Sequence, residues 1–301
     1  MLPFKLVYHP RYDLNLGPHV FPSQKFRLIY EALLREGIAS AEDFLMPGRA
    51  DDADLLRVHT PEWIDKLKTG NLTASEVMKL EVPYSAELAE AVWLAAGGSI
   101  LAGQRALQDG FACNLTGGFH HAFPSHGEGF CAIHDVAVAI RRLQADTQVR
   151  KAMVIDTDVH HGNGTAYIFR DDPSVFTLSI HQENNYPAHK PPSNVDLNMP
   201  DRTDDEEYLA ALLPAVKKSL DAFQPDVVFY VGGADPFCED QLGGLDLTKK
   251  GLRERDKRVF EEVRGRGIPV TTTLAGGYAR NVDDTVRIHV NTILAAKEVA
   301  E

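Results

Sequence analysis

The stretch AMVIDTDVHHGNG, residues 152–164, decides the fold class of this chain. Its first half, 152–157, is a short apolar run rich in branched residues, which is typical of a buried strand. Its second half is polar and contains two glycines, which let backbone approach closely and leave room for a ligand. We therefore predict a buried strand that carries acidic and imidazole side chains to one edge of a sheet.

Outward from this stretch, strands and helices are expected to alternate. Further strand candidates of similar composition are 4–8, 112–116, 175–180, 226–231 and 269–274. Helical patterns lie between these strands. One starts at Thr60, with Pro61 in its first turn and Gly70 as its stop. Others start at Asp135 and at Thr248, and a further helix is expected over 205–222. This alternation predicts an α/β fold with a single open, mainly parallel sheet and helices on both faces.

Length and composition fit one globular domain. At about 150 residues per domain, 301 residues could form two, but α/β folds of this length often form one. No repeat or linker interrupts the chain, and we interpret the proline-rich stretch 187–200 as a surface loop. We expect residues 1–301 to be one catalytic domain. The chain has 44% hydrophobic and 25% charged residues, and this composition excludes disordered and fibrous proteins.

Net charge and cysteine content indicate which binding partners and which cellular compartment to expect. A net charge of −12 disfavours a nucleic-acid partner. Cys113, Cys131 and Cys238 lack CxxC spacing, so neither a disulfide framework nor a cysteine zinc site is indicated. The N-terminus does not resemble a signal peptide, and the apolar run 91–103 is too short and glycine-broken to span a bilayer. We expect a cytoplasmic protein without membrane contact.

Reactive side chains follow four of the predicted strands, in the segments 117–121, 156–164, 232–235 and 276–278. In open α/β sheets, ligands bind outside the carboxyl ends of the strands, so these segments are expected to meet. No GxxxxGK[ST], complete GxGxxG or GxSxG motif is present, which argues against a nucleotide cofactor and a hydrolase serine.

Two acids and a histidine in the segment 156–164 point to a metal. Extended backbone places Asp156, Asp158 and His160 on one face, and Asp235 can join them from a neighbouring strand. An Asp, His, Asp set with an open position suits a catalytic zinc. The alternative is that the acids cap helices and the histidines pack in turns; for the whole set we favour the metal.

The pair His120-His121 is the evident source of a general base, since imidazole titrates near neutral pH. Tyr278, on a glycine turn, could donate a hydrogen bond to a developing oxyanion, although a buried core tyrosine is the competing interpretation. His161 is expected to have a supporting or structural role.

Together these motifs resemble the zinc-dependent histone deacetylase family, which has the arginase/deacetylase fold. The matching segments are 57–63, 117–122, 129–131, 156–164, 233–235 and 276–278, and details at 81–83, 242–245 and 263–266 are most similar to the class IV branch. The resemblance implies that Asp158, His160 and Asp235 hold Zn²⁺, which polarises the acyl carbonyl and activates water.

The same resemblance implies the catalytic groups. His121 acts as general base and then protonates the leaving amine, while His120, paired with Asp156, gives electrostatic support. Tyr278 stabilises the oxyanion. Asn163 stands where some relatives have an aspartate, and a neutral partner should leave His121 with a lower pKa than a carboxylate would.

A monovalent cation, K⁺, is implied near the zinc. Its ligands are Asp156, the backbone carbonyls of Asp158 and His160, and Ser179 with Ile180.

The resemblance also implies a narrow acyl-lysine channel. Its walls are Gly129 and Phe130 on one side and Tyr186 on the other, and Glu81 is the rim acid that grips substrate backbone.

The implied activity is removal of acyl groups, acetyl or longer fatty acyl, from lysine side chains of proteins or peptides. The alternatives are hydrolysis of small acylated amines such as polyamines, a non-catalytic acyl-lysine reader, and an arginase-like binuclear manganese hydrolase. The class IV similarity implies that long fatty-acyl groups are removed at least as efficiently as acetyl.

Overall fold

A computed structural model describes residues 1–14 and 16–301. Its described residues form one eight-stranded sheet in the order β2-β1-β3-β8-β7-β4-β5-β6, and every neighbouring pair is parallel. The strands are β1 Lys5–Val7, β2 Phe44–Leu45, β3 Phe111–Asn114, β4 Ala152–Asp156, β5 Val175–Gln182, β6 Val195–Met199, β7 Val227–Gly232 and β8 Val270–Leu274. The central strands β3, β8, β7 and β4 are buried along their whole length.

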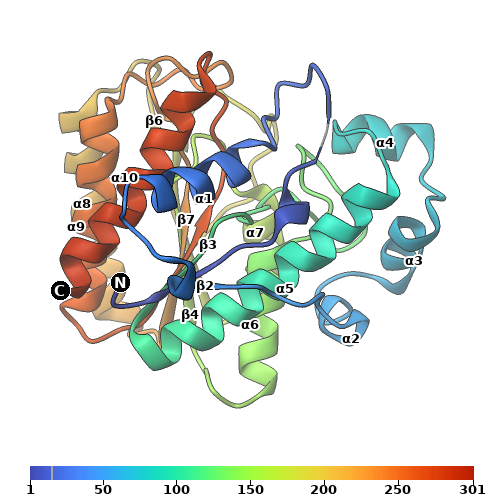
Figure 1. The fold of residues 1–301 in the computed structure, drawn as a ribbon, viewed down its shortest axis with the longest axis horizontal. Helices are drawn as coiled ribbons and strands as arrows, with labels where there is room; N and C mark the ends of the chain where they lie inside the picture. Colours follow the sequence, from blue (N-terminus) through green and yellow to red (C-terminus); the bar gives the residue numbers. More distant parts are fainter. Residues whose placement is uncertain (15) are drawn as a thin grey trace.

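Helices cover both faces of this sheet, as Figure 1 shows. The α-helices are α1 Lys25–Arg35, α2 Asp52–Leu55, α3 Pro61–Thr69, α4 Ala74–Leu80, α5 Ala86–Asp109, α6 Asp135–Ala145, α7 Asn163–Phe169, α8 Asp205–Phe223, α9 Lys249–Arg264 and α10 Val282–Ala300. Helices α1, α8, α9 and α10 pack together on one side, and α5 with α6 on the other. The predicted open parallel α/β sheet is confirmed.

All six predicted strands are present with small shifts of their ends. The interpretation of 187–200 as a loop is wrong in part, because β6 occupies Val195–Met199 and pairs with β5. This strand is only partly buried and lies at the edge of the sheet, so it needs no apolar run and its sequence gives no strong signal. The two-residue β2 was also missed.

The helix starts agree with the capping signals at Thr60 and Thr248, whose side chains accept from backbone N–H groups of the first turn. At α6 the predicted cap is displaced by one residue. His134 caps this helix, and the buried Asp135 carboxylate instead accepts hydrogen bonds from the N–H groups of Gly118 (3.2 Å) and Phe119 (2.9 Å). Asp135 thereby holds the turn that precedes His120.

A buried ion pair ties helix α9 to the strand ends that carry the reactive residues. Arg255 and Asp256 are both fully buried, and the Arg255 guanidinium donates to the carbonyls of Thr157 (3.1 Å) and Gly233 (2.9 Å). Asp256 accepts from Arg255 and from the hydroxyls of Tyr230 and Thr292. The pair therefore joins β4, β7, α9 and α10 behind the sheet edge.

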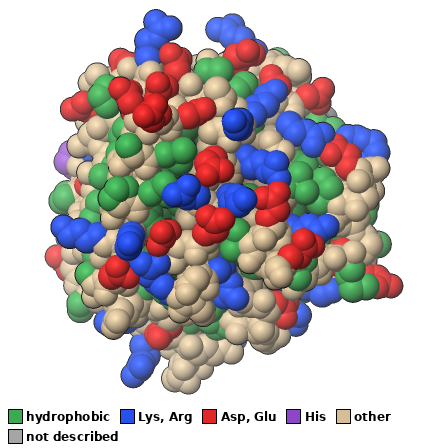
Figure 2. All heavy atoms as spheres, turned by 90° about the vertical axis from the view of Figure 1, so that its left-hand side faces the viewer, with side chains coloured by type: hydrophobic (Ala, Val, Ile, Leu, Met, Phe, Trp, Pro, Cys, Tyr) green, Lys and Arg blue, Asp and Glu red, His purple; other side chains and the backbone are tan. Residues whose placement is uncertain are grey.

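The solvent-facing side of α8, α9 and α10 carries exposed charged side chains instead of buried ones. Figure 2 looks onto the side covered by α8, α9 and α10, where basic and acidic side chains alternate. Arg258, for example, lies 3.5 Å from Glu254 and 3.8 Å from Glu261, and all three side chains are exposed. Such exposed pairs contribute little to stability. None of the helices in the described ranges is long and apolar enough to cross a membrane.

We expect Arg255→Ala to lower the free energy of unfolding by about 3–5 kcal/mol, because Asp256 would remain buried without its cation. Arg258→Ala, on the same helix, should change it by no more than about 0.5 kcal/mol. Urea unfolding of the two variants, followed by circular dichroism, measures both. Equal stability of the two variants would contradict the role given to the buried pair.

Candidate active site

The carboxyl ends of β3, β8, β7 and β4 meet at one cavity of about 380 Å³. His121, His160 and Tyr278 line it, and they come from the segments after β3, β4 and β8. Parallel strands bring these segments to the same edge, as the sequence predicts.

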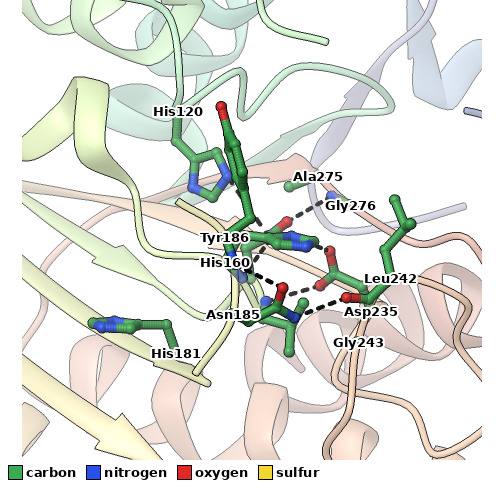
Figure 3. A network of polar contacts seen from close by, with 12 residues as sticks. His120, His160, His181, Asn185, Tyr186, Asp235, Leu242, Gly243, Ala275 and Gly276 are labelled. Atoms are coloured by element: carbon green, nitrogen blue, oxygen red, sulfur yellow. Dashed lines mark hydrogen bonds and ion pairs between the residues drawn. The ribbon is translucent and has the colours of Figure 1, made fainter. Parts of the chain in front are cut away.

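Asp158, His160 and Asp235 lie together and are all buried, and His160 also lines this cavity. One potential ligand atom from each lies within 4.8 Å of the others. His160 Nδ1 is 3.0 Å from Asp158 Oδ1 and 3.3 Å from Asp235 Oδ2. Figure 3 shows His160 and Asp235 turned toward one another, with Gly276 beside them.

The backbone supports these carboxylates but leaves one oxygen free. The N–H groups of Gly276 and Val159 donate to Asp158 Oδ2 and Asp235 Oδ1, both at 2.9 Å. Within the described part of the chain, the buried Asp235 Oδ2 has no hydrogen-bond partner. A buried, unpaired carboxylate oxygen beside an imidazole is a donor set that fits a divalent metal such as zinc.

The two adjacent histidines have opposite electrostatic environments. Burial by itself lowers the pKa of His120, but the charges of Asp156 and Asp158 outweigh it and raise this pKa to about 9. His120 Nδ1 lies 2.7 Å from Asp156 Oδ2. Burial lowers the pKa of His121 well below its usual value, and the positive charges of His120 and His160 lower it further. His120 is thus held as a cation and His121 as a neutral imidazole.

The pKa of His121 is low mainly because the side chain is buried, and the expected difference from an aspartate partner stays a prediction. Its bond to Asn163 slightly favours the cation, whereas burial dominates the shift. His121 Nδ1 lies 2.7 Å from Asn163 Oδ1, and Asn163 Nδ2 donates to Glu128 Oε1 at 2.8 Å. Glu128 therefore orients the Asn163 amide, so that His121 donates from Nδ1 and keeps its lone pair on Nε2.

Glu128 is a site residue that sequence reasoning missed. It also accepts from the Tyr186 hydroxyl at 2.9 Å, so it links the histidine to the wall of the cavity. A single glutamate in a glycine turn gives no pattern by which to find it.

Tyr278 lines the cavity, with its ring centroid 6.3 Å from that of His160. Burial and then the charge of Asp158 raise its pKa well above the usual value, so its hydroxyl stays protonated and able to donate. Its ring also faces the buried Lys25, whose Nζ lies 5.7 Å from the ring centroid and donates to the carbonyl of Ala275. Lys25 was missed too, because a lysine in a helical pattern normally indicates a solvent-exposed face.

The predicted channel residues Gly129, Phe130, Tyr186 and Glu81 all line the same cavity. Gly129 packs so closely that an added Cβ would lie 2.9 Å from His121 Cδ2 and 3.0 Å from Tyr186 Cε1. Phe130 and Glu81 have φ values of 68° and 58°, in the left-handed region that only constrained non-glycine residues occupy. The chain thus places the walls of the cavity in an unusual backbone conformation.

The residues predicted to hold a monovalent cation are brought together in the sheet. Asp156 of β4 is directly opposite Ser179 of β5, and Ile180 follows it. Asp158 donates its N–H to Asp156 Oδ1 at 3.2 Å. All of these residues are buried.

Comparison with known proteins identifies relatives of the chain over nearly its whole length. The family model described as a histone deacetylase domain matches residues 19–293. An uncharacterized protein of Picosynechococcus sp. is 40% identical over 98% of this chain and 99% of its own length. Histone deacetylase 2 of Arabidopsis thaliana is 30% identical, over 92% of this chain and 75% of its own length. The crystal structure of the HDA15 HD domain superposes with a TM-score of 0.84 and 25% identity, over 98% of this chain and 88% of that one.

We expect Gly276→Ala to weaken divalent metal binding about 10- to 100-fold, the scale seen when groups that support metal ligands are disturbed. An added Cβ would lie 2.7 Å from the carboxylate carbon of Asp235 and would overlap oxygens of both Asp235 and Asp158, so both carboxylates would have to shift. Competition with a chelator of known zinc affinity measures the effect. Gly48→Ala is the control, because an added Cβ there meets no described atom within 4 Å; if both variants bind zinc equally, this packing constraint is wrong.

Proposed function

Since this chain belongs to the histone deacetylase family, and is therefore an amide hydrolase of the deacetylase type, we propose that it uses zinc to remove acyl groups from lysine side chains. The observation that carries this proposal is the buried group of Asp158, His160 and Asp235, which reaches the cavity through His160, where His121 also lines the wall. We further propose that residues 1–301 act as one catalytic domain.

Asp158, His160 and Asp235 would hold the zinc, and Asp235 Oδ2 is the atom that otherwise lacks a partner in the described chain. When bound, zinc polarises the acyl carbonyl and makes a water molecule more acidic. Asp156, Ser179 and Ile180, with the carbonyls of Asp158 and His160, would hold the monovalent cation.

His121 is the general base in this proposal. Asn163 holds its Nδ1–H, so the Nε2 lone pair is free to take a proton from the attacking water and later to give it to the leaving amine. The charged His120 lies beside it, with ring centroids 4.0 Å apart, and favours the build-up of negative charge on the substrate. Tyr278 donates a hydrogen bond from its hydroxyl to the carbonyl oxygen as that charge develops.

The proposed substrate enters between Phe130 and Tyr186, with the acyl-bearing amine extended along the cavity. Glu81 lies at the same cavity and could accept hydrogen bonds from the backbone of a peptide. A small acylated amine lacks those backbone groups. Glu81→Gln should therefore raise the KM for a peptide substrate more than that for an acylated polyamine.

A small apolar space lies beyond Phe130. This second cavity, with Phe21, Phe26, Phe119 and Phe130 in its lining, has a volume of about 20 Å³, which is room for roughly one water molecule. Acetyl needs no such space, whereas a long acyl chain requires these rings to move. We therefore propose acetyl-lysine as the first substrate to test, and activity on long fatty-acyl groups stays a prediction.

Tyr278→Phe should retain zinc and lower kcat on an acetyl-lysine peptide about 10²- to 10³-fold, because it removes one oxyanion donor. Tyr84→Phe makes the same change at a hydroxyl that donates to the Leu67 carbonyl, and its kcat should be unchanged. Asp235→Ala should lose turnover and the zinc ion held by Asp158, His160 and Asp235. If wild-type protein bound the peptide without any turnover, an acyl-lysine reader would replace the hydrolase proposal.

Chain length provides a separate test. Each methylene that is buried can contribute up to about 0.8 kcal/mol, so a channel that opens for a long chain would raise kcat/KM steeply from acetyl to octanoyl to myristoyl. A steady fall along this series would instead show that the phenylalanine rings stay closed, and would reject the expectation of long-chain activity. The series is measured on one peptide sequence that differs only in its acyl group.

A further inference from the structure

A second group of potential metal ligands lies outside the proposed catalytic cavity. His161, His181 and Asp196 each offer one ligand atom within 4.8 Å of the others. They come from the β4–α7 loop, from β5 and from β6, so three separate segments meet there. Figure 3 shows His181 well to one side of the cluster formed by His160 and Asp235.

The sheet itself brings two of these side chains together. Strands β5 and β6 are parallel, with Ser179 opposite Asp196 and His181 opposite Asn198. Side chains alternate along a strand, so Ser179, His181 and Asp196 share one face. His161 reaches the same face from the loop after β4, and its ring centroid is 4.6 Å from that of His181.

Polar atoms in this group are buried without the partners that buried polar atoms normally have. His161 and His181 are both fully buried. His161 Nε2 lies 3.2 Å from Asp196 Oδ1, yet the two are not aligned for a hydrogen bond. Neither these atoms nor His181 Nε2 have another partner in residues 1–14 and 16–301. Buried polar atoms without partners in a native structure call for an explanation such as a bound ion or water molecule.

In two of these side chains, the polar atom that faces away from the group has a hydrogen-bond partner in the protein. His181 Nδ1 is 2.9 Å from Ser179 Oγ, and Asp196 Oδ2 accepts from the N–H of Ser193 at 2.9 Å. Metal-ligating histidines and carboxylates are typically oriented in this way, with one atom held by the protein and the other left for the metal.

We propose that His161, His181 and Asp196 bind a second zinc ion, which clamps the edge strand β6 to β5 and to the loop that carries His160. Two imidazoles and one carboxylate are ordinary zinc ligands, and in a tetrahedral site the ligand atoms lie about 3.3 Å apart. The 3.2 Å between His161 Nε2 and Asp196 Oδ1 already has this value. The side chain of Asp196 is 24% exposed although its Oδ1 is buried, so the group lies just beneath the surface at the edge of the sheet. Three protein ligands leave the fourth position of a tetrahedral ion to a water molecule.

This site is independent of the proposed reaction, and it changes how a metal count must be interpreted. Two metals per chain would otherwise suggest an arginase-like binuclear centre. In a binuclear centre both ions depend on the residues around Asp235, whereas here each ion depends on its own three ligands. Variants of Asp235 and of Asp196 therefore distinguish one binuclear centre from two separate metal sites.

The experiment measures zinc per chain by mass spectrometry on tag-free protein, after dialysis against micromolar zinc. We expect about two zinc ions in the wild type and about one in Asp196→Asn, which keeps the shape of a partly exposed side chain. Asp235→Ala should also hold about one, and the double variant Asp235→Ala/Asp196→Asn should hold none. The outcome that overturns the proposal is an unchanged zinc content in Asp196→Asn, whether the wild type holds one ion or two.

A second measurement covers the case in which a variant binds zinc weakly. Added zinc should raise the melting temperature of Asp235→Ala, because an ion that binds only the folded state stabilises it. The shift should vanish in the double variant. Cobalt loaded into Asp235→Ala should give the visible absorption of a tetrahedral site, and loss of this absorption in the double variant assigns it to Asp196. Equal melting shifts or equal spectra with and without Asp196 would contradict the second site.

Discussion

The mutual repulsion of two buried carboxylates, Asp158 and Asp235, is the interaction on which the rest of the site depends. Burial and the charge of Asp158 raise the pKa of Asp235 to about 7, while the charges of His120 and His160 overcome the effect of burial and hold the pKa of Asp158 well below its usual value. Two such groups cannot both be ionised at low cost unless positive charge lies between them. Backbone N–H donors supply part of it, and the divalent cation proposed for this site would supply the rest.

This arrangement explains why the scaffold behind the site is so heavily hydrogen-bonded. Thr157 and Gly233, whose carbonyls accept from Arg255, are direct neighbours of Asp158 and of the segment that carries Asp235. The glycine turn before His120 is held in the same way by Asp135. Buried charges thus fix the backbone at the ends of β3, β4 and β7, and a site held on rigid strand ends keeps its geometry better than one on loops.

The sequence predicts this part of the molecule well because its signals are local. A buried strand such as β4 is a continuous apolar run, and the acids and histidines after it stand together in the chain. The misses have non-local causes. Strand β6 is held by backbone pairing at an edge, and Lys25 resembles a surface lysine until α1 is packed against the Tyr278 turn. Glu128 acts through Asn163, 35 residues away, so no spacing rule could connect them.

The edge strands of the sheet, β2 and β6, affect whether folded chains can associate by adding strands to one another. Edge strands offer unpaired backbone groups to which another chain can add. Here β2 has only two residues, and β6 is followed by Pro200 and directs the carboxylate of Asp196 toward the interior side. A strand added beside β6 would cover this charge and remove its remaining water. Both edges are therefore poor templates for intermolecular strand addition, which protects an otherwise extended parallel sheet from aggregation.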